Sequence, residues 1–199
     1  MTDFKNSETA RNLMRAFAGE SQARSRYTMA ADLARFQNMP AVEAVFRYTA
    51  DQEKEHARIF YEYLEPLDKE TVFIDGGYPV DRESNTLAQL NAAAHNEFEE
   101  HDVVYRSFAE TAQKEGYPEI AASFRMIAGI EKIHGERFQY LSDLLGAGAL
   151  YKREKSTSWV CTNCGYVYEG KEPPRQCPVC HHEQGYFAGE ELAPWFLRK

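Results

Sequence analysis

Acidic side chains recur at positions of the chain that otherwise carry apolar residues. In four segments Leu, Phe and Ala return in steps of three and four residues, the spacing of one helix face. Four glutamates fall in the same steps: Glu20, Glu53, Glu97 and Glu131. Burying several unpaired carboxylates is prohibitively costly, so these groups must be protonated, paired with bases or bound to cations. Arg24 lies in the same stripe, but one base cannot neutralise such a cluster, whereas two metal ions can.

Two histidines complete this pattern. His56 and His134 follow Glu53 and Glu131 by three residues, so each lies on the same side of its helix as the glutamate. A single Glu-x-x-His pair is usually solvated, but two pairs in phase with apolar stripes are hard to explain in that way. One Glu from each of two helices, with Glu-x-x-His from two others, is the ligand set of di-iron and di-manganese bundles. Oxygen and imidazole donors suit iron or manganese, so the sequence predicts a dinuclear metal site.

The segment around Glu97 offers further candidates. Glu100 shares the face of Glu97 three residues later and is predicted to be an additional ligand. Glu99 points elsewhere and is expected to be solvated, while His95 and His101 are expected at the surface or behind the ligands. Tyr27 and Tyr105 lie about two turns beyond carboxylates. They are either ordinary core aromatics or, as we slightly prefer, hydrogen-bond donors to a ligating glutamate.

Four helices are needed to position these groups. Their periodicity predicts them over 8–36, 41–64, 87–114 and 119–145. Pro40 and the Gly116-Tyr117-Pro118 run give two short breaks, while the connection from Pro66 to Thr86 is long and contains Asp75-Gly76-Gly77. Two short links and one long crossover predict a mainly α fold with a ferritin-like four-helix bundle.

The bundle sequence also repeats internally. Residues 44–60 recur as 122–138 at a shift of 78, so the two Glu-x-x-His motifs coincide. Upstream the shift is 77, which carries Glu20 onto Glu97. One extra residue therefore lies between Glu97 and Tyr105. Because one-residue insertions in helices are typical of π-bulges at functional sites, we expect a π-bulge there.

The cysteines form a second candidate metal site. All four lie in the last quarter of the chain, as Cys161-x-x-Cys164 and Cys177-x-x-Cys180. No apolar segment follows Met1, so we expect no signal peptide and a reducing, cytoplasmic location, where a metal is favoured over disulfides. Paired Cys-x-x-Cys motifs give tetrahedral coordination of iron or of structural zinc. A small aromatic core is expected to shield the metal: Trp159, Tyr166, Tyr168, Phe187 and Trp195.

Composition limits the remaining possibilities. The chain has 199 residues, 43% of them hydrophobic, and its 31 acidic and 23 basic residues give a net charge of -8. A disordered chain is excluded, no apolar run approaches the ~20 residues of a membrane span, and the acidic balance argues against a nucleic-acid partner. The expected organisation is a bundle over 1–148, a linker over 149–158 and a small β/loop metal domain over 159–199.

Together these motifs resemble the rubrerythrin family over nearly the whole chain. The resemblance implies that the small β/loop domain over 159–199 is rubredoxin-like. The resemblance implies three iron ions per chain, two in the bundle and one bound by the four cysteines, and no organic cofactor. It implies that Glu53 and Glu131 bridge the two bundle irons. Glu20 would bind the first iron and Glu97 with His134 the second. Glu100 and His56 would be alternative ligands of the first iron, exchanged with its redox state.

The same resemblance implies an activity. It implies reduction of hydrogen peroxide to water in protection against oxidative stress, with electrons from an NAD(P)H-dependent reductase or small electron carrier, in a homodimer or higher homo-oligomer. One local departure is His181, where free-standing rubredoxins usually have Gly. Two alternatives remain open from the residues alone: a ferroxidase, and an iron-buffering protein whose four-cysteine site holds structural zinc.

Overall fold

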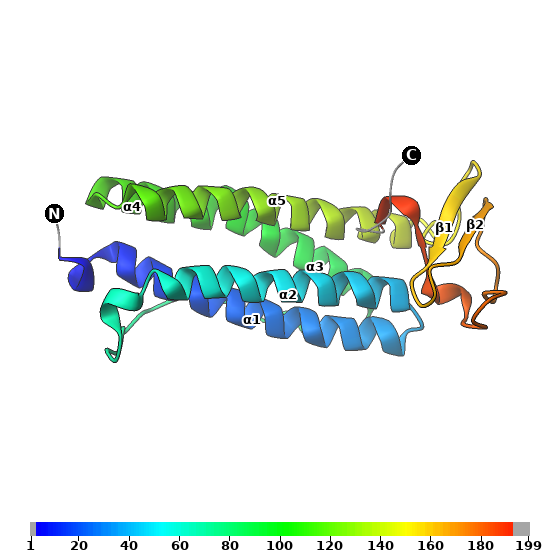
Figure 1. The fold of residues 1–199 in the computed structure, drawn as a ribbon, viewed down its shortest axis with the longest axis horizontal. Coiled ribbons are helices and arrows are strands. Elements are labelled where there is room, and N and C mark those ends of the chain that lie inside the picture. Colours follow the sequence, from blue (N-terminus) through cyan, green and yellow to red (C-terminus); the bar gives the residue numbers. More distant parts are fainter. Residues whose placement is uncertain (1–2, 193–199) are drawn as a thin grey trace.

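Four long helical segments run side by side, with a small sheet at one end of them (Figure 1). The computed structural model describes residues 3–192. The helices are α1 (Glu8–Phe36), α2 (Pro40–Glu62), α3 (Thr86–Glu99), α4 (Tyr105–Glu115) and α5 (Pro118–Gly146). Helices α3 and α4 form one segment, joined by a π-helix. The predicted mainly α, ferritin-like bundle is therefore confirmed, and each predicted helix boundary lies within two residues of the observed one.

Local signals in the sequence explain where the helices begin and end. The Ser7 side chain accepts a hydrogen bond from the backbone N–H of Ala10 at the start of α1, and Asn85 caps α3 in the same way. Pro40 and Pro118 occupy first-turn positions of α2 and α5, where a missing N–H costs nothing. Gly116 ends α4 with φ of 92°, a left-handed conformation that glycine adopts without strain.

The π-helix spans Glu100–Val104, and this confirms the expected insertion. Eight residues separate Glu97 from Tyr105, but only seven separate Glu20 from Tyr27 in the first half. The wider turn absorbs the extra residue, so that Glu97 and Tyr105 both reach the bundle interior, at 1% and 2% exposure. In a regular α-helix the extra residue would rotate the two side chains about 100° out of this alignment.

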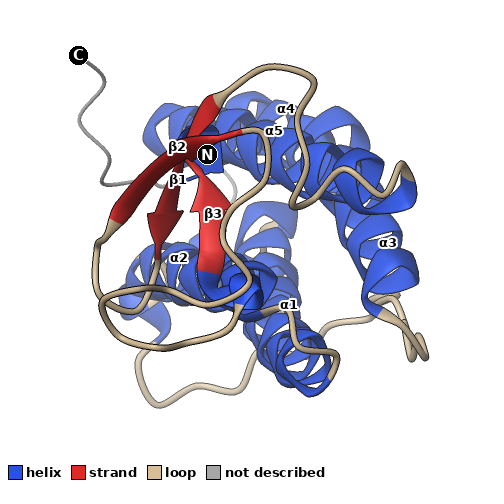
Figure 2. Ribbon diagram, turned by 90° about the vertical axis from the view of Figure 1, so that its right-hand side faces the viewer, coloured by secondary structure: helices blue, strands red, loops and turns tan. Residues whose placement is uncertain are grey.

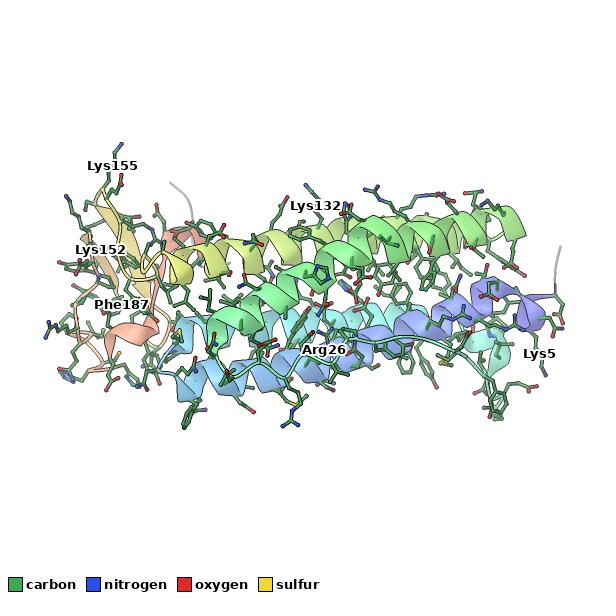
Figure 3. All side chains as sticks on the ribbon, turned by 180° about the vertical axis from the view of Figure 1, so that it is seen from behind. Lys5, Arg26, Lys132, Lys152, Lys155 and Phe187 are labelled. Carbon is green, nitrogen blue, oxygen red and sulfur yellow. The ribbon has the colours of Figure 1, made fainter. Side chains whose placement is uncertain are left out.

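A long crossover connects the two helical hairpins. After a 3-10 turn at Glu65–Leu67 the chain runs back along α1 without regular structure until α3 begins (Figure 3). Two ion pairs fasten it to α1: Arg15 with Asp75 at 2.7 Å and Arg26 with Asp81 at 3.1 Å. This connection makes α3 antiparallel to α1, which places the ligand candidates of both hairpins at the same height.

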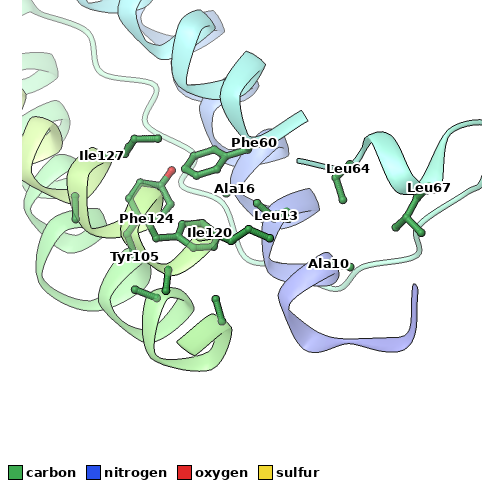
Figure 4. Close-up of a cluster of buried hydrophobic side chains, with 14 residues drawn as sticks. Ala10, Leu13, Ala16, Phe60, Leu64, Leu67, Tyr105, Ile120, Phe124 and Ile127 are labelled. Atoms are coloured by element: carbon green, nitrogen blue, oxygen red, sulfur yellow. The ribbon is translucent and has the colours of Figure 1, made fainter. Parts of the chain in front are cut away.

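Apolar clusters close the bundle on both sides of that height. One cluster contains Phe60 and Phe124, whose ring centroids lie 5.0 Å apart (Figure 4). The other contains Phe46 and Phe138, also 5.0 Å apart. The internal repeat equates Phe46 with Phe124 and Phe60 with Phe138, so the two contacts are copies of each other. The polar groups between the clusters are thereby shielded from water along the bundle axis.

The small domain is a three-stranded antiparallel sheet in the order β2–β1–β3 (Figure 2). Its strands are β1 (Thr157–Cys161), β2 (Val167–Gly170) and β3 (Phe187–Gly189). Trp159 and Phe187 are buried with two cysteines, and Tyr166 and Tyr168 pack against them, as predicted. Trp195 lies outside the described residues.

This domain sits against the turn between α1 and α2. A Cβ atom on Gly185 would lie 2.4 Å from the backbone oxygen of Asn38, so only glycine permits the approach. Within residues 3–192, no helix has the length and apolar character needed to cross a membrane.

Candidate metal centres

Six buried side chains meet at the centre of the bundle. They form two overlapping sets of four, with all ligand atoms of a set within 4.8 Å of one another. The first set is Glu20, Glu53, His56 and Glu131, and the second is Glu53, Glu97, Glu131 and His134. Both sets share Glu53 and Glu131. His56 is 5% exposed and the other five at most 1%, so the cluster is removed from bulk water.

Four helices supply this cluster. Glu20 comes from α1, Glu53 and His56 from α2, Glu97 from α3, and Glu131 and His134 from α5. Each histidine faces the carboxylates through Nδ1. His134 Nδ1 lies 2.9 Å from Glu131 Oε2 and 3.0 Å from Glu53 Oε1, and His56 Nδ1 lies 2.9 Å from Glu131 Oε1. The two imidazole rings are nearly parallel, at an interplanar angle of 17°.

The unsatisfied atoms of this cluster show whether metal ions fit it. Eight buried oxygen and nitrogen atoms of the six side chains have no well-directed hydrogen-bond partner among the described residues, including both carboxylate oxygens of Glu53 and Glu131 and Nδ1 of both histidines. Orphaned buried polar atoms are rare and costly in folded proteins. Here the orphaned atoms are all potential ligands turned toward one another. The residues therefore fit a pair of metal ions.

The protonation of the cluster leads to the same conclusion. Burial and neighbouring carboxylates raise the pKa of Glu20 well above its usual range and that of Glu97 to about 8. Although burial opposes ionisation, contacts with the two histidines lower the pKa of Glu131 to about 2. Against the effect of burial, contacts with the carboxylates raise the pKa of His56 to about 9 and of His134 to about 12. The cluster thus retains protons in place of cations, and metal uptake must release them.

Glu100, the predicted further ligand, lies outside both sets of four. It is half-buried in the π-helix and borders a cavity of about 310 Å³ between the crossover and the bundle. Tyr78 of the crossover and Tyr105 line the same cavity. Burial and the carboxylates of Glu97 and Glu131 raise the pKa of Glu100 well above its usual range.

The other candidates of this region lie apart from the cluster. His95 and Glu99 are exposed, and His101 Nδ1 lies 2.7 Å from the backbone oxygen of Ala128. The expectation that Arg24 lies in the buried stripe was wrong: it is exposed and lines an open groove between α1 and α2. The buried base of α1 is Arg26, which lies next to the crossover (Figure 3).

Two tyrosines approach the carboxylates from opposite sides. The hydroxyl of Tyr27 on α1 donates to Glu97 Oε1 on α3, and the hydroxyl of Tyr105 on α4 donates to Glu20 Oε1 on α1. Both rings are buried, at 1% and 2% exposure. Each tyrosine therefore orients a glutamate that only one of the two sets contains.

Removing each hydroxyl in turn should lower the metal affinity of one set at a time. We expect Tyr105→Phe to weaken metal binding at the Glu20 set by about 10- to 100-fold and Tyr27→Phe to weaken the Glu97 set similarly, because each change removes the donor that orients one ligand. Titration of metal-free protein with Co²⁺ measures both affinities. Tyr140→Phe, at the exposed surface of α5, is the matched control. Equal loss at both sets in either variant would contradict this assignment.

The second centre is formed by the four cysteines. Four thiolates about 2.3 Å from one tetrahedral ion stand about 3.8 Å apart. The Sγ atoms of Cys161 and Cys180 are 3.7 Å apart, as are those of Cys164 and Cys177. All four Sγ atoms lie within 4.8 Å of one another and no disulfide joins them. The arrangement is therefore that of a tetrahedral four-cysteine site.

The backbone at His181 has the same left-handed conformation as that at Gly165 in the first motif. Gly165 and His181, each directly after the second cysteine of its motif, have φ of 76° and 59° and donate to the backbone oxygens of Cys161 and Cys177. His181 therefore adopts a conformation that glycine favours. The backbone N–H of the next residue, His182, lowers the pKa of Cys180 to about 5, so this thiolate forms readily.

Comparison with known proteins gives matches along most of the chain. A family model described as "Rubrerythrin" matches residues 11–142, and one described as "Rubrerythrin, rubredoxin-like domain" matches residues 159–188. A rubrerythrin of Clostridium perfringens is 44% identical over 188 residues, covering 94% of this chain and 96% of that protein. A rubrerythrin of Porphyromonas gingivalis is 44% identical over 183 residues, covering 92% and 90%.

Solved structures agree with these matches. Nigerythrin in its fully reduced, all-ferrous state is similar with a TM-score of 0.62 and 25% identity, over 92% of this chain and 90% of that one. Symerythrin from Cyanophora paradoxa, reduced with dithionite, has the same bundle fold, with a TM-score of 0.59 over 69% and 85% of the two chains.

Proposed function

The chain belongs to the rubrerythrin family, and we propose that it reduces hydrogen peroxide to water as a non-haem di-iron peroxidase. Family membership indicates an oxidoreductase with a di-iron bundle and a rubredoxin-like domain, and the donor sets support three iron ions per chain. The observation that carries the proposal is the sharing of Glu53 and Glu131 by two sets of ligands, next to a four-cysteine site in one chain.

The bundle residues have separate tasks in this proposal. When bound, two adjacent ferrous ions supply together the two electrons that cleavage of one O–O bond requires. Glu53 and Glu131 would hold both ions, Glu20 and His56 would complete one side, and Glu97 and His134 would complete the other. Tyr27 and Tyr105 hold Glu97 and Glu20 in place through hydrogen bonds, and the apolar clusters keep water out.

Peroxide needs a path to this interior. The cavity lined by Glu100 and Tyr105 lies between the crossover and the bundle, and Tyr105 in turn donates to Glu20 of the cluster. Its volume of about 310 Å³ exceeds what a peroxide molecule requires, so we propose that peroxide enters from this side. Glu100, with its raised pKa, can carry a proton there. We assign Glu100 to this entrance, with the exchange between Glu100 and His56 at the first iron as the family resemblance implies.

Electrons enter through the small domain in this proposal. Cys164 is exposed and Cys180 half-exposed, so the four-cysteine site has an edge at the surface where a reductase or small carrier can dock. Helix α5 continues 12 residues beyond His134, from position 134 to 146, or about 18 Å along its axis, before the small domain begins. Because this length of helix separates the bundle cluster from the small domain within one chain, we favour electron delivery between subunits of a homodimer or larger homo-oligomer. We place the protein in the cytoplasm, with NAD(P)H as the source of the electrons.

Reoxidation of the reduced protein tests the proposal. We expect the anaerobically reduced, iron-loaded protein to be reoxidised by hydrogen peroxide at least about tenfold faster than by an equal concentration of oxygen. Stopped-flow absorbance of the ferric bundle and of the ferric four-cysteine site measures both rates. Faster reaction with oxygen would favour a ferroxidase. A four-cysteine site that contains zinc and lacks the ferric-thiolate colour would favour an iron-buffering protein.

A further inference from the structure

The internal repeat breaks at three polar residues behind one of the two histidines. A shift of 78 superposes His56 on His134. At the same shift each of the three polar residues is paired with an isoleucine: Thr49 with Ile127, Gln52 with Ile130, and Arg137 with Ile59. All three polar residues belong to one hydrogen-bonded network that ends on His134. The duplicated halves thus treat their two equivalent histidines differently.

The network runs outward from the far nitrogen of the ring. His134 Nε2 lies 3.1 Å from Gln52 Oε1. Arg137 Nη1 donates to the same Gln52 oxygen at 3.4 Å and to Thr49 Oγ1 at 3.1 Å. Its guanidinium carbon also lies 5.3 Å from the centre of the Tyr48 ring, which fixes the side chain against α2.

These contacts determine which nitrogen of His134 keeps its proton when metal uptake releases the other. A guanidinium can only donate hydrogen bonds, so Arg137 requires that Gln52 present its oxygen and not its NH₂ group. That oxygen can only accept, so His134 must donate from Nε2. The neutral ring then has its lone pair on Nδ1, the atom that faces Glu53 and Glu131. The network therefore leaves Nδ1, the nitrogen that would bind a metal, with a free lone pair.

The other histidine has no such support. Among residues 3–192, no hydrogen bond to His56 Nε2 is present, and isoleucines occupy the three equivalent positions. An apolar side chain can neither donate to an imidazole nitrogen nor accept from it, so isoleucine cannot select a tautomer. Within the described residues, His56 is thus held by polar contacts at Nδ1 alone, whereas His134 is held at both ring nitrogens.

We infer that Gln52, held by Arg137, which Thr49 in turn anchors, is a positioning residue that keeps His134 a permanent metal ligand, a support that the half of the centre around His56 lacks in the described part of the chain. The broken repeat therefore makes the two halves of the centre chemically unequal. This inference rests on the two-metal site of the proposed function but not on its oxidant, so the two can fail separately.

Iron release without any oxidant tests the inference. In the fully loaded, anaerobically reduced protein, we expect Gln52→Ile to lose one bundle iron to a ferrous chelator about 10- to 100-fold faster, with the other bundle iron and the iron of the four cysteines unchanged. Isoleucine is the residue that the repeat itself places at this position, so the helix should accept it. Gln139→Ile, which removes an exposed amide of α5, is the matched control.

A conservative variant separates positioning from packing. Gln52→Glu keeps an acceptor for His134 Nε2, so iron release should stay within about twofold of the wild type. Because a carboxylate draws the imidazole proton more strongly, the midpoint potential of the bundle irons should fall. Arg137→Met, which frees the amide to rotate, should give an intermediate release rate and serves if Gln52→Ile does not fold. Wild-type release in Gln52→Ile and Arg137→Met, or fast release in Gln52→Glu, would overturn the inference.

Discussion

Replacing Glu53 by alanine is expected to leave one iron per chain and to abolish peroxide turnover. Glu53 belongs to both sets of ligands, and each of its oxygens faces a different histidine. Its loss therefore removes a donor from both metals at once. We expect the turnover rate to fall by at least about 10³-fold, equivalent to about 4 kcal/mol of transition-state stabilisation.

Metal analysis and absorbance measure this effect together. The iron content should fall from three to one per chain while the colour of the iron bound by the four cysteines remains. Glu55→Ala is the matched control, since Glu55 lies on the same helix but pairs with Arg58 at the surface. Peroxide turnover that survived Glu53→Ala would show that the bundle cluster is not the reaction site.

Replacing Cys177 by serine should separate the delivery of electrons from their use. Cys177 is fully buried and is one of the four thiols, so its loss removes the small domain's metal and the stability that this metal contributes. Turnover driven by an NAD(P)H-linked reductase should fall at least about 100-fold, because electrons are proposed to reach the bundle through the iron of the four cysteines. A bundle reduced chemically beforehand should still consume one equivalent of peroxide at nearly the wild-type rate.

The control for this variant lies in the same motif. Val179 is 60% exposed between Cys177 and Cys180, so Val179→Ser changes the loop without removing a thiolate. It should retain both the colour and the reductase-driven rate. If Cys177→Ser kept reductase-driven turnover, electrons would reach the bundle by a route that bypasses the small domain.

The parts that the sequence predicted share one physical cause. Helical periodicity and capping act over a few residues, so the extents of α1 and α5 follow from spacing, from Ser7 and from Pro118. The π-helix was predictable as well, because a repeat with one extra residue must absorb it somewhere. Buried carboxylates carry so high a cost that their phase with the apolar stripe alone indicated metal ions.

The parts that it missed depend on neighbours distant in the chain. Arg24 and Arg26 are both plausible buried bases by spacing, and Asp81 of the crossover, 55 residues away, is what pairs with Arg26. Gln52 and Arg137 lie on different helices, and their relation to His134 emerges only when α2 and α5 pack together. The departure of three residues from the repeat was the signal that could have found them.

The sharing of Glu53 and Glu131 by the two ligand sets has a consequence for assembly. Helices α1 and α2 supply three ligands of one set and take Glu131 from the other hairpin, while that hairpin completes its own set with Glu53. Neither hairpin holds a full coordination sphere, so docking of the halves and metal binding are linked equilibria. Two fragments cut within the crossover should therefore recombine in proportion to the iron supplied.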